Sequence, residues 1–215
     1  MATLRLFLLQ SVLFPGQSLQ LVVFEPRYHQ LVRECLDSHE PFGVALIREG
    51  PEVGGPAVPC SVGTTARIVH ARPLPDGRVA LEVTGERRFR ILATHTDLPY
   101  VSADVEYPAD LEGASVLAAE LERVRHAYRE VVRLRQAAAG EYEREIAAPG
   151  TPAALADAVG ALQLNSAAAR QRVLEADDPA TRLQRAAELL ERATPRVRRQ
   201  SERAIADRVR GPRLN

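Results

Sequence analysis

The sequence predicts an α+β protein in which a β-rich first half precedes a helical second half. Short apolar runs of strand length, separated by turn signals rich in Pro and Gly, fill residues 1–110. The composition changes near residues 108–113, and beyond them alanine dominates while apolar residues recur at helical spacing. We therefore expect two domains, one covering residues 1–110 and the other residues 111–215.

Six or seven strands and one early helix are expected in the first half. The Pro15-Gly16 turn separates the first two apolar runs, and the Asp76-Gly77 pair is typical of a hairpin. Gly85 is expected to break the sheet between two later strands. This pattern favours a compact, curved, barrel-like sheet. The expected strands cover residues 4–9, 19–24, 42–47, 62–71, 79–83, 87–93 and 101–107, with a helix at 27–37 and a loop at 50–59.

Several short helices are expected in the second half. The longest follows Leu117, and another begins at Ser166. None of them is long enough to be stable alone, so they are expected to pack together as a helical bundle. Three further starts combine a capping residue with Pro at the first helical position: Thr151-Pro152, Asp178-Pro179 and Thr194-Pro195.

The basic residues are unusual because all 28 are arginine and none is lysine. A Schiff-base site, a Walker-type phosphate site and a Ser–Lys dyad all need an amine that arginine does not supply, so these mechanisms are excluded. The net charge of zero gives no overall field that attracts nucleic acid. Residues 196–215 carry seven Arg against two acidic residues, which is typical of a solvated end, with contact to an acidic partner as the alternative.

No pattern of residues predicts a catalytic, cofactor-binding or metal-binding site. The five histidines form no i,i+3 or i,i+4 pair, and no phosphate-binding or nucleophile-elbow motif occurs. Cys35 is interpreted as a buried free thiol on a helix face. The cluster of residues 87–90 is interpreted as a solvated strand face with Arg88 and Arg90 together, an RNA contact being the alternative. Pro15 cuts the first apolar stretch short of a membrane span, so the chain is expected to be cytoplasmic.

A series of motifs, taken in order, resembles the substrate-binding domain of Lon-type ATP-dependent proteases. In the first half these motifs are Leu13-Phe14-Pro15-Gly16, Phe24-Glu25-Pro26-Arg27-Tyr28-His29-Gln30-Leu31-Val32, Phe42-Gly43-Val44, Val62-Gly63-Thr64, Asp76-Gly77-Arg78, Gly85-Glu86-Arg87-Arg88-Phe89-Arg90-Ile91 and Pro99-Tyr100. In the second half they are Leu155-Ala156-Asp157, Leu162-Gln163-Leu164, Arg170-Gln171-Arg172-Val173-Leu174-Glu175 and Arg182-Leu183, so that the resemblance extends to about residue 192.

The resemblance implies a PUA-like pseudo-barrel followed by a helical bundle. In Lon proteases this region recognises unfolded or tagged substrates, and the ATPase and protease parts lie downstream. Because the chain ends at Asn215 and has no lysine, we expect a stand-alone, non-enzymatic module without cofactors. Its expected partners are unfolded proteins or peptides, held in an apolar groove or at an exposed sheet edge; self-association or a protein partner remains open.

An RNA-binding PUA-like module is the alternative function, although the zero net charge disfavours nucleic acid, and no membrane partner is expected. The motif residues themselves are expected to have mainly structural roles. Phe14, Phe24 and Phe89 are predicted to lie in the core. Gly16 and Gly85 are predicted to occupy backbone positions that few other residues tolerate.

Overall fold

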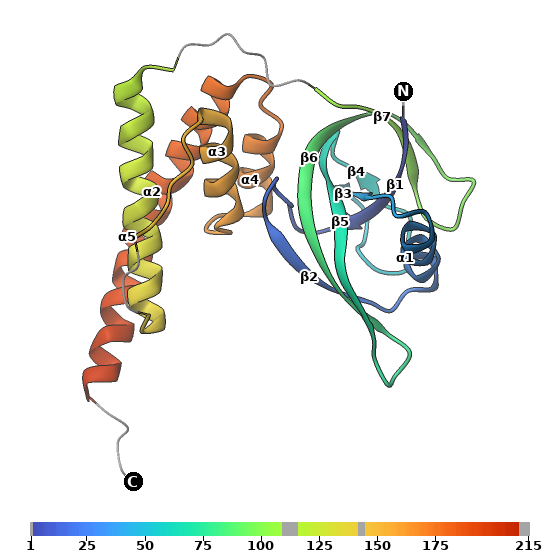
Figure 1. Cartoon of the computed structure of the whole chain (residues 1–215), viewed down its shortest axis with the longest axis horizontal. Coiled ribbons are helices and arrows are strands. Elements are labelled where there is room, and N and C mark those ends of the chain that lie inside the picture. The colour runs from blue at the N-terminus through green and yellow to red at the C-terminus, as the bar shows by residue number, and fades with distance from the viewer. Residues whose placement is uncertain (1, 109–115, 142–144, 211–215) are drawn as a thin grey trace. The chain divides into compact units, whose positions relative to one another are not determined.

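The computed structural model describes residues 2–108, 116–141 and 145–210. The chain divides into two units, which are described separately below (Figure 1). The first unit contains residues 1–109 together with residues 170–175, and the second contains the rest. The predicted boundary between residues 110 and 111 lies outside the described residues. The fold is α+β, as the sequence predicts, and the sheet is mostly antiparallel.

One seven-stranded sheet forms most of the first unit. The strands are β1 (Ala2–Leu9), β2 (Ser18–Val23), β3 (Phe42–Glu49), β4 (Val58–Pro59), β5 (Val62–Pro73), β6 (Val79–His95) and β7 (Ser102–Glu106). The order β1-β7-β6-β5-β3 closes on itself because β1 also pairs with β3, in parallel. Strand β2 is added beside β6 and β4 beside β3, so these two strands lie outside the closed ring.

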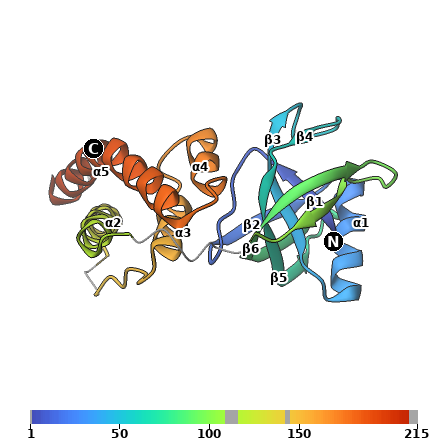
Figure 2. The ribbon, with the colours of Figure 1, turned by 90° about the horizontal axis from the view of Figure 1, so that it is seen from above.

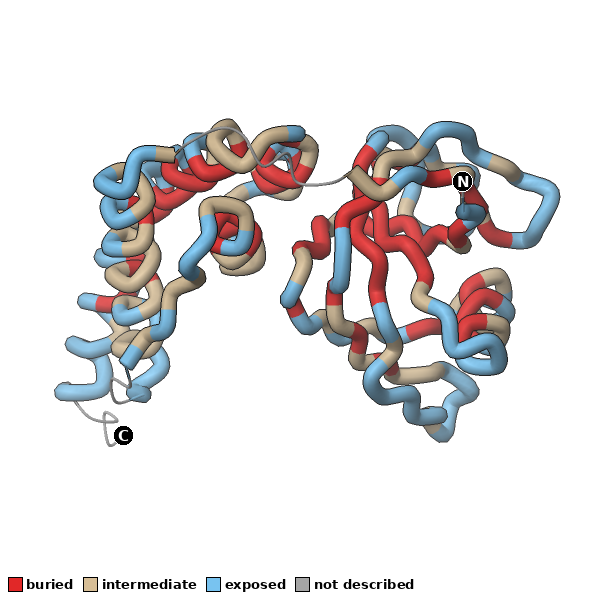
Figure 3. The backbone as a smooth tube through the Cα atoms, turned by 45° about the horizontal axis from the view of Figure 1, so that its top comes forward, coloured by how far each residue is buried: buried red, intermediate tan, exposed pale blue. Residues whose placement is uncertain are grey.

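Two clusters of buried apolar side chains lie against this sheet. Figure 3 marks the buried residues along the strands in red. Strand β1 contributes to both clusters, because successive side chains of a strand point to opposite faces. Leu6 and Leu8 belong to the cluster around Phe89, whereas Phe7 and Leu9 belong to the other cluster. The helix α1 (Pro26–Ser38) covers this second cluster with its buried side chains Tyr28, Leu31, Val32 and Cys35. Burial on both faces explains why β1 is almost continuously apolar.

The Pro15-Gly16 turn fastens the start of β2 to the middle of β6. Gln17 N donates to Phe14 O at 3.1 Å, and Gly16 has a φ of 75°, as a type II turn requires. Gly16 N then donates to Gly85 O at 2.8 Å, and Gly85 N donates to Gln17 O at 2.9 Å. A Cβ on Gly85 would clash with Phe14 O, so only glycine permits this close approach. The predicted special roles of both glycines are confirmed.

The predicted break at Gly85 is wrong, because β6 continues through it from Val79 to His95. Gly85 keeps its backbone hydrogen bonds with the residues of the turn, so the strand has no reason to end there. A register shift does follow Gly85: Ala66 pairs with Gly85 but Thr64 pairs with Arg88, so Glu86 and Arg87 of β6 lie opposite the single residue Thr65 of β5. A glycine within a strand therefore marks close backbone contact here, together with a bulge in the same strand.

The second unit is helical, and its helices α2 and α3 both pack against α5, as Figure 2 shows for α2. The helices of this unit are α2 (Ala118–Ala139), α3 (Pro152–Ala161) and α5 (Pro179–Arg210), whereas most of α4 (Ala167–Leu174) falls within residues 170–175 of the first unit. The three starts predicted at Thr151, Ser166 and Asp178 are confirmed. Each side-chain oxygen accepts a hydrogen bond from the backbone N–H three residues later, at 3.3, 3.3 and 2.8 Å respectively.

The start predicted at Thr194-Pro195 is wrong, because α5 continues through Pro195. Proline removes one backbone donor from the helix interior, which favours a kink or an end. The Thr194 hydroxyl donates to Leu190 O at 2.7 Å, a bond that favours a bend and does not replace the donor that Glu191 O loses. A buried stripe nevertheless continues across the proline to Val197 and Ser201. Burial of this stripe outweighs the local preference of the Thr-Pro pair for a helix start.

Candidate functional site

Strand β2 has one open edge: in the part of the chain that the structure describes, it pairs only with β6. The Gly85–Gln17 hydrogen bond sets which residues face β6. Because bonded and non-bonded pairs alternate in an antiparallel ladder, Leu19, Leu21 and Val23 bond to β6. The backbone N–H and C=O groups of Ser18, Gln20 and Val22 therefore point away from β6, toward the open edge.

A groove of about 340 Å³ lies beside this strand, and we call it the β2 groove. It is lined by the end of β1, by β2 from Gln20 onward, by the Phe24-Glu25 link, by Tyr28 of α1 and by Glu52-Val53. Most of these side chains are apolar. The groove thus combines a sheet edge with an apolar surface, the two features that the sequence analysis named as routes to peptide binding.

Three apolar side chains of the β2 groove are half exposed: Val22 at 48%, Phe24 at 51% and Val53 at 55%. Phe14 and Phe89 are buried as predicted, but the core position predicted for Phe24 is wrong. The strand alternation explains the difference. Leu19, Leu21 and Val23 point inward, so Val22 and Phe24 fall on the outer side. The same alternation, read from the sequence, identifies Phe24 as an exposed aromatic.

Tyr28 gives the groove a fixed wall. Its hydroxyl accepts a hydrogen bond from Leu8 N at 3.3 Å, and its ring stacks on Phe7 with centroids 3.9 Å apart. The Arg27 guanidinium lies 4.7 Å from the Tyr28 ring centroid. Burial raises the pKa of the Tyr28 phenol, so the hydroxyl stays protonated. These contacts hold the ring in place on three sides.

The two charged residues that line the β2 groove, Glu25 and Glu52, are acidic. Glu25 Oε2 lies 2.9 Å from Arg27 Nη2 and accepts from Gly54 N at 3.1 Å. Glu52 Oε1 accepts from Gln10 N at 3.2 Å, and Arg27 Nη2 donates to Glu52 O at 3.3 Å. These bonds hold the loop at residues 52–54 against α1, and because Arg27 offsets the charge of Glu25, the excess negative charge of the wall comes from Glu52.

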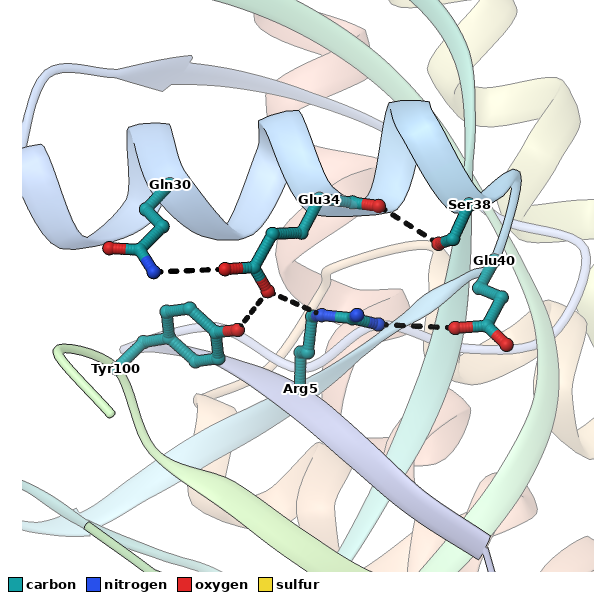
Figure 4. A network of polar contacts seen from close by, with 6 residues as sticks. All are labelled: Arg5, Gln30, Glu34, Ser38, Glu40 and Tyr100. Atoms are coloured by element: carbon teal, nitrogen blue, oxygen red, sulfur yellow. Dashed lines mark hydrogen bonds and ion pairs between the residues drawn. The ribbon is translucent and has the colours of Figure 1, made fainter. Parts of the chain in front are cut away.

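A separate polar network fastens α1 to β1 (Figure 4). Glu34 accepts from Arg5 Nε at 2.9 Å, from Gln30 Nε2 at 2.9 Å and from the Tyr100 hydroxyl. The hydrogen bond from Tyr100, followed by those from Gln30 and Arg5, lowers the pKa of Glu34 to about 2. Burial, followed by the bond to Glu34, raises the pKa of Tyr100 to about 12. Because Glu34 is held ionised by three donors, it is a structural anchor and a poor general base.

The arginine cluster of β6 differs from the predicted solvated face. Arg88 is buried, and Arg90 Nε lies 3.4 Å from Glu106 Oε1. Residues 170–175 belong to the same unit, and Gln171 Nε2 donates to the carbonyl of Val62, the register partner of Arg90. A further layer of chain therefore lies against this part of the sheet. The burial of Arg88 also removes it from any nucleic-acid surface.

The remaining predictions concern cysteine, metal ligands and membrane spans. Cys35 is a buried free thiol, as predicted, and burial raises its pKa to about 11, which keeps it protonated and unreactive. In the residues that the structure describes, no group of three or more His, Cys, Asp or Glu side chains is placed to hold a metal ion. None of the described helices is both long and apolar enough to cross a membrane.

The sequence of the chain is similar to those of one family of known proteins. The family model of the ATP-dependent protease La (LON) substrate-binding domain matches residues 3–192. The Lon protease of Anaeromyxobacter dehalogenans is 30% identical over 188 residues, and Lon protease 2 of Myxococcus xanthus is 31% identical over 188 residues. Each match covers 85% of this chain and 22% of the relative, so the chain spans about a fifth of the length of these curated relatives.

Solved structures show the same fold. A Lon N-terminal domain protein from Xanthomonas campestris matches with a TM-score of 0.65 and 31% identity, over 86% of this chain and 96% of that one. The N-terminal domain of the Mycobacterium avium complex Lon protease matches with a TM-score of 0.64, over 88% of this chain and 98% of that one, and at 17% identity it supports the fold alone. The match to the family model over residues 3–192 shows that the chain belongs to the family of the Lon substrate-binding domain.

Proposed function

We propose that this chain is a non-enzymatic module that binds segments of non-native polypeptide in the β2 groove. The observation that carries the proposal is the half-exposed Phe24 beside an unpaired sheet edge. With Val22 and Val53, Phe24 forms a group of exposed apolar side chains in one groove, and grouped exposed apolar side chains are a sign of a protein-binding surface. Family membership supports the same function, because the matched domain is named for substrate binding.

The proposal includes further expectations about architecture, chemistry and location that follow the family resemblance. The closed ring of strands is a PUA-like pseudo-barrel, and the helices of the second unit form a bundle. No cofactor takes part in binding, and the chain cleaves no peptide bond by itself. The setting is the cytoplasm, which suits two free cysteines, because reducing conditions keep thiols from forming disulfides.

A binding assay with an unfolded protein tests the proposal. Carboxymethylated, fluorescently labelled α-lactalbumin is titrated with the chain, and its polarisation is compared with that of the native, disulfide-bonded form. Saturable binding of the unfolded form alone is expected. Phe24→Ser should weaken it, whereas Leu92→Ser, which removes a similarly exposed apolar side chain of β6 outside the groove, should not.

The outcomes separate the alternatives. Absence of saturable binding at high micromolar concentration contradicts the proposed function. Equal loss in the Phe24 and Leu92 variants contradicts the assignment to the β2 groove. Release of labelled fragments during the titration, detected on a denaturing gel, contradicts the expectation that the chain is not an enzyme.

A further inference from the structure

We infer that the β2 groove binds its ligand by β-augmentation, in which an extended segment adds as a new strand along the open edge of β2. The inference rests on the proposed function and specifies how binding occurs. It also defines the substrate class: an extended segment with apolar side chains at alternate positions, flanked by a basic residue.

The two strands outside the closed ring differ in how they present their edges. Strand β4 is only two residues long and ends in Pro59, and both features prevent a further strand from pairing. Strand β2 is six residues long, with neither proline nor a charged side chain. Natural edge strands usually carry such protection, so β2 is a ready template for another chain.

The backbone of β2 offers a ligand strand a defined set of hydrogen-bonding groups. Ser18, Gln20 and Val22 each direct one N–H and one C=O toward the open edge, as the Gly85–Gln17 bond sets the register. Residues two apart in a strand lie about 6.8 Å apart, so these three span the length of about five ligand residues. A ligand helix has no free backbone groups in its interior and leaves this edge unpaired, so the edge favours an extended segment.

The side chains of the β2 groove determine which residues are preferred in the ligand. A strand added beside β2 alternates its side chains between the two faces, so one set lies on the face of Leu21 and the other on the face of Val22 and Phe24. Apolar residues suit the set beside Val22 and Phe24, whose side chains are half exposed. Of the two carboxylates that line the groove, Glu25 is paired with Arg27, so the charge of Glu52 favours Lys or Arg in the ligand and disfavours acidic residues.

Backbone methylation of a peptide ligand tests the inference directly. The probe is a fluorescein-labelled peptide of sequence Lys-Val-Thr-Val-Thr-Val-Thr-Val-Lys, together with a series in which one amide at a time carries a methyl group. Methylation removes a donor and adds bulk at the strand edge. Amides that face β2 should lose about tenfold in affinity when methylated, and the intervening amides should change less than about twofold.

The pattern distinguishes this inference from the proposed function. An alternating series of losses supports β-augmentation. Equal effects at every amide, or none, overturn it while leaving peptide binding, and hence the proposed function, in place. Failure of the unmethylated peptide and of the unfolded protein to bind contradicts both.

A matched pair of variants gives a second test from the protein side. Gln20→Pro and Gln20→Ala both remove the exposed Gln20 side chain, but only proline removes the outward N–H. Because this N–H faces away from β6, the change breaks no bond of the β2–β6 ladder. Gln20→Pro should weaken peptide binding about tenfold, and Gln20→Ala less than about twofold. Equal affinities would overturn the inference; if Gln20→Pro does not fold, the methylated peptides decide.

Discussion

Arg182 and Asp157 form a buried ion pair in the helical unit, with Nη2 of Arg182 2.6 Å from Oδ1 of Asp157. The Arg182 side chain is 1% exposed and that of Asp157 is 11% exposed. The pair joins α3 to α5, and it brings together two of the motifs on which the family resemblance rests. An ion pair therefore connects these two motifs, although the paired residues are 25 positions apart in the sequence.

Removing one member of this pair should strongly destabilise the helical unit. Arg182→Ala leaves the Asp157 carboxylate buried without its main counter-charge, and a broken buried pair typically costs about 3–5 kcal/mol. We expect a loss of that size in the free energy of unfolding, measured by urea denaturation followed by circular dichroism. The signal should be monitored at 222 nm, where the helices dominate.

The double variant Asp157→Leu, Arg182→Met provides the control. Replacing both charges with apolar side chains removes the desolvation cost along with the attraction, so its stability should exceed that of Arg182→Ala. If the double variant is less stable than the single one, the pair contributes through geometry that apolar packing does not replace.

The elements of this fold are largely predictable from local sequence, because their signals are local. A Pro-Gly turn, a Pro at a helix start and a capping oxygen each act within four residues, and the starts at Thr151, Ser166 and Asp178 follow from them. The same signal fails at Thr194 because the buried stripe of α5 outweighs it. That packing depends on contacts with other helices, which a local pattern does not contain.

The β2 groove was less predictable for a related reason. An open edge is defined by which strands pair, and pairing is a long-range property of the chain. The exposure of Phe24 has a local signal in the alternation of β2, but its place in a family motif favoured a core position instead. The burial of Arg88 also had no local signal. The unit that contains Arg88 includes residues 170–175, which are distant from it in the sequence.

Glu34 should make the stability of the first unit depend on pH in the acid range. Its pKa is lowered from 4.5 to about 2, chiefly by the hydrogen bond from Tyr100. A lowered folded-state pKa gives stability that is complete above the unfolded value and is lost as the pH falls from about 4.5 to 2. Glu34→Gln should therefore be less stable at pH 7, and its stability should fall less steeply across this window.

Unfolding in urea at a series of pH values measures this effect, with Glu40→Gln as the control. Glu40 also binds Arg5, but its side chain is 63% exposed and the ion pair is accordingly weak. This variant should retain the slope of the parent chain between pH 4.5 and 2. An unchanged slope in Glu34→Gln would show that other carboxylates control the acid transition.

Gly85 and Gly16 should respond differently to substitution by alanine, although they lie in the same turn contact. At Gly85 the new Cβ meets Phe14 O, so the backbone of the Pro15-Gly16 turn or of β6 must move. At Gly16 the space is open, and only the φ of 75° opposes a side chain. We expect a loss of about 2–3 kcal/mol for Gly85→Ala and about 1–2 kcal/mol for Gly16→Ala, measured by urea unfolding.

Phe24 should contribute little to stability but much to the apolar character of the β2 groove. Because its side chain is half exposed, Phe24→Ser should change the free energy of unfolding by less than about 1 kcal/mol, unlike substitution of a core phenylalanine, which costs about 3–5 kcal/mol. The dye bis-ANS, whose fluorescence rises on apolar surfaces, should bind this variant less than the parent chain. Leu92→Ser should leave dye binding nearly unchanged, because Leu92 is exposed to a similar extent but does not line the groove. A large loss of stability in Phe24→Ser would instead assign this side chain to the core, and the proposed binding surface would lose its main anchor.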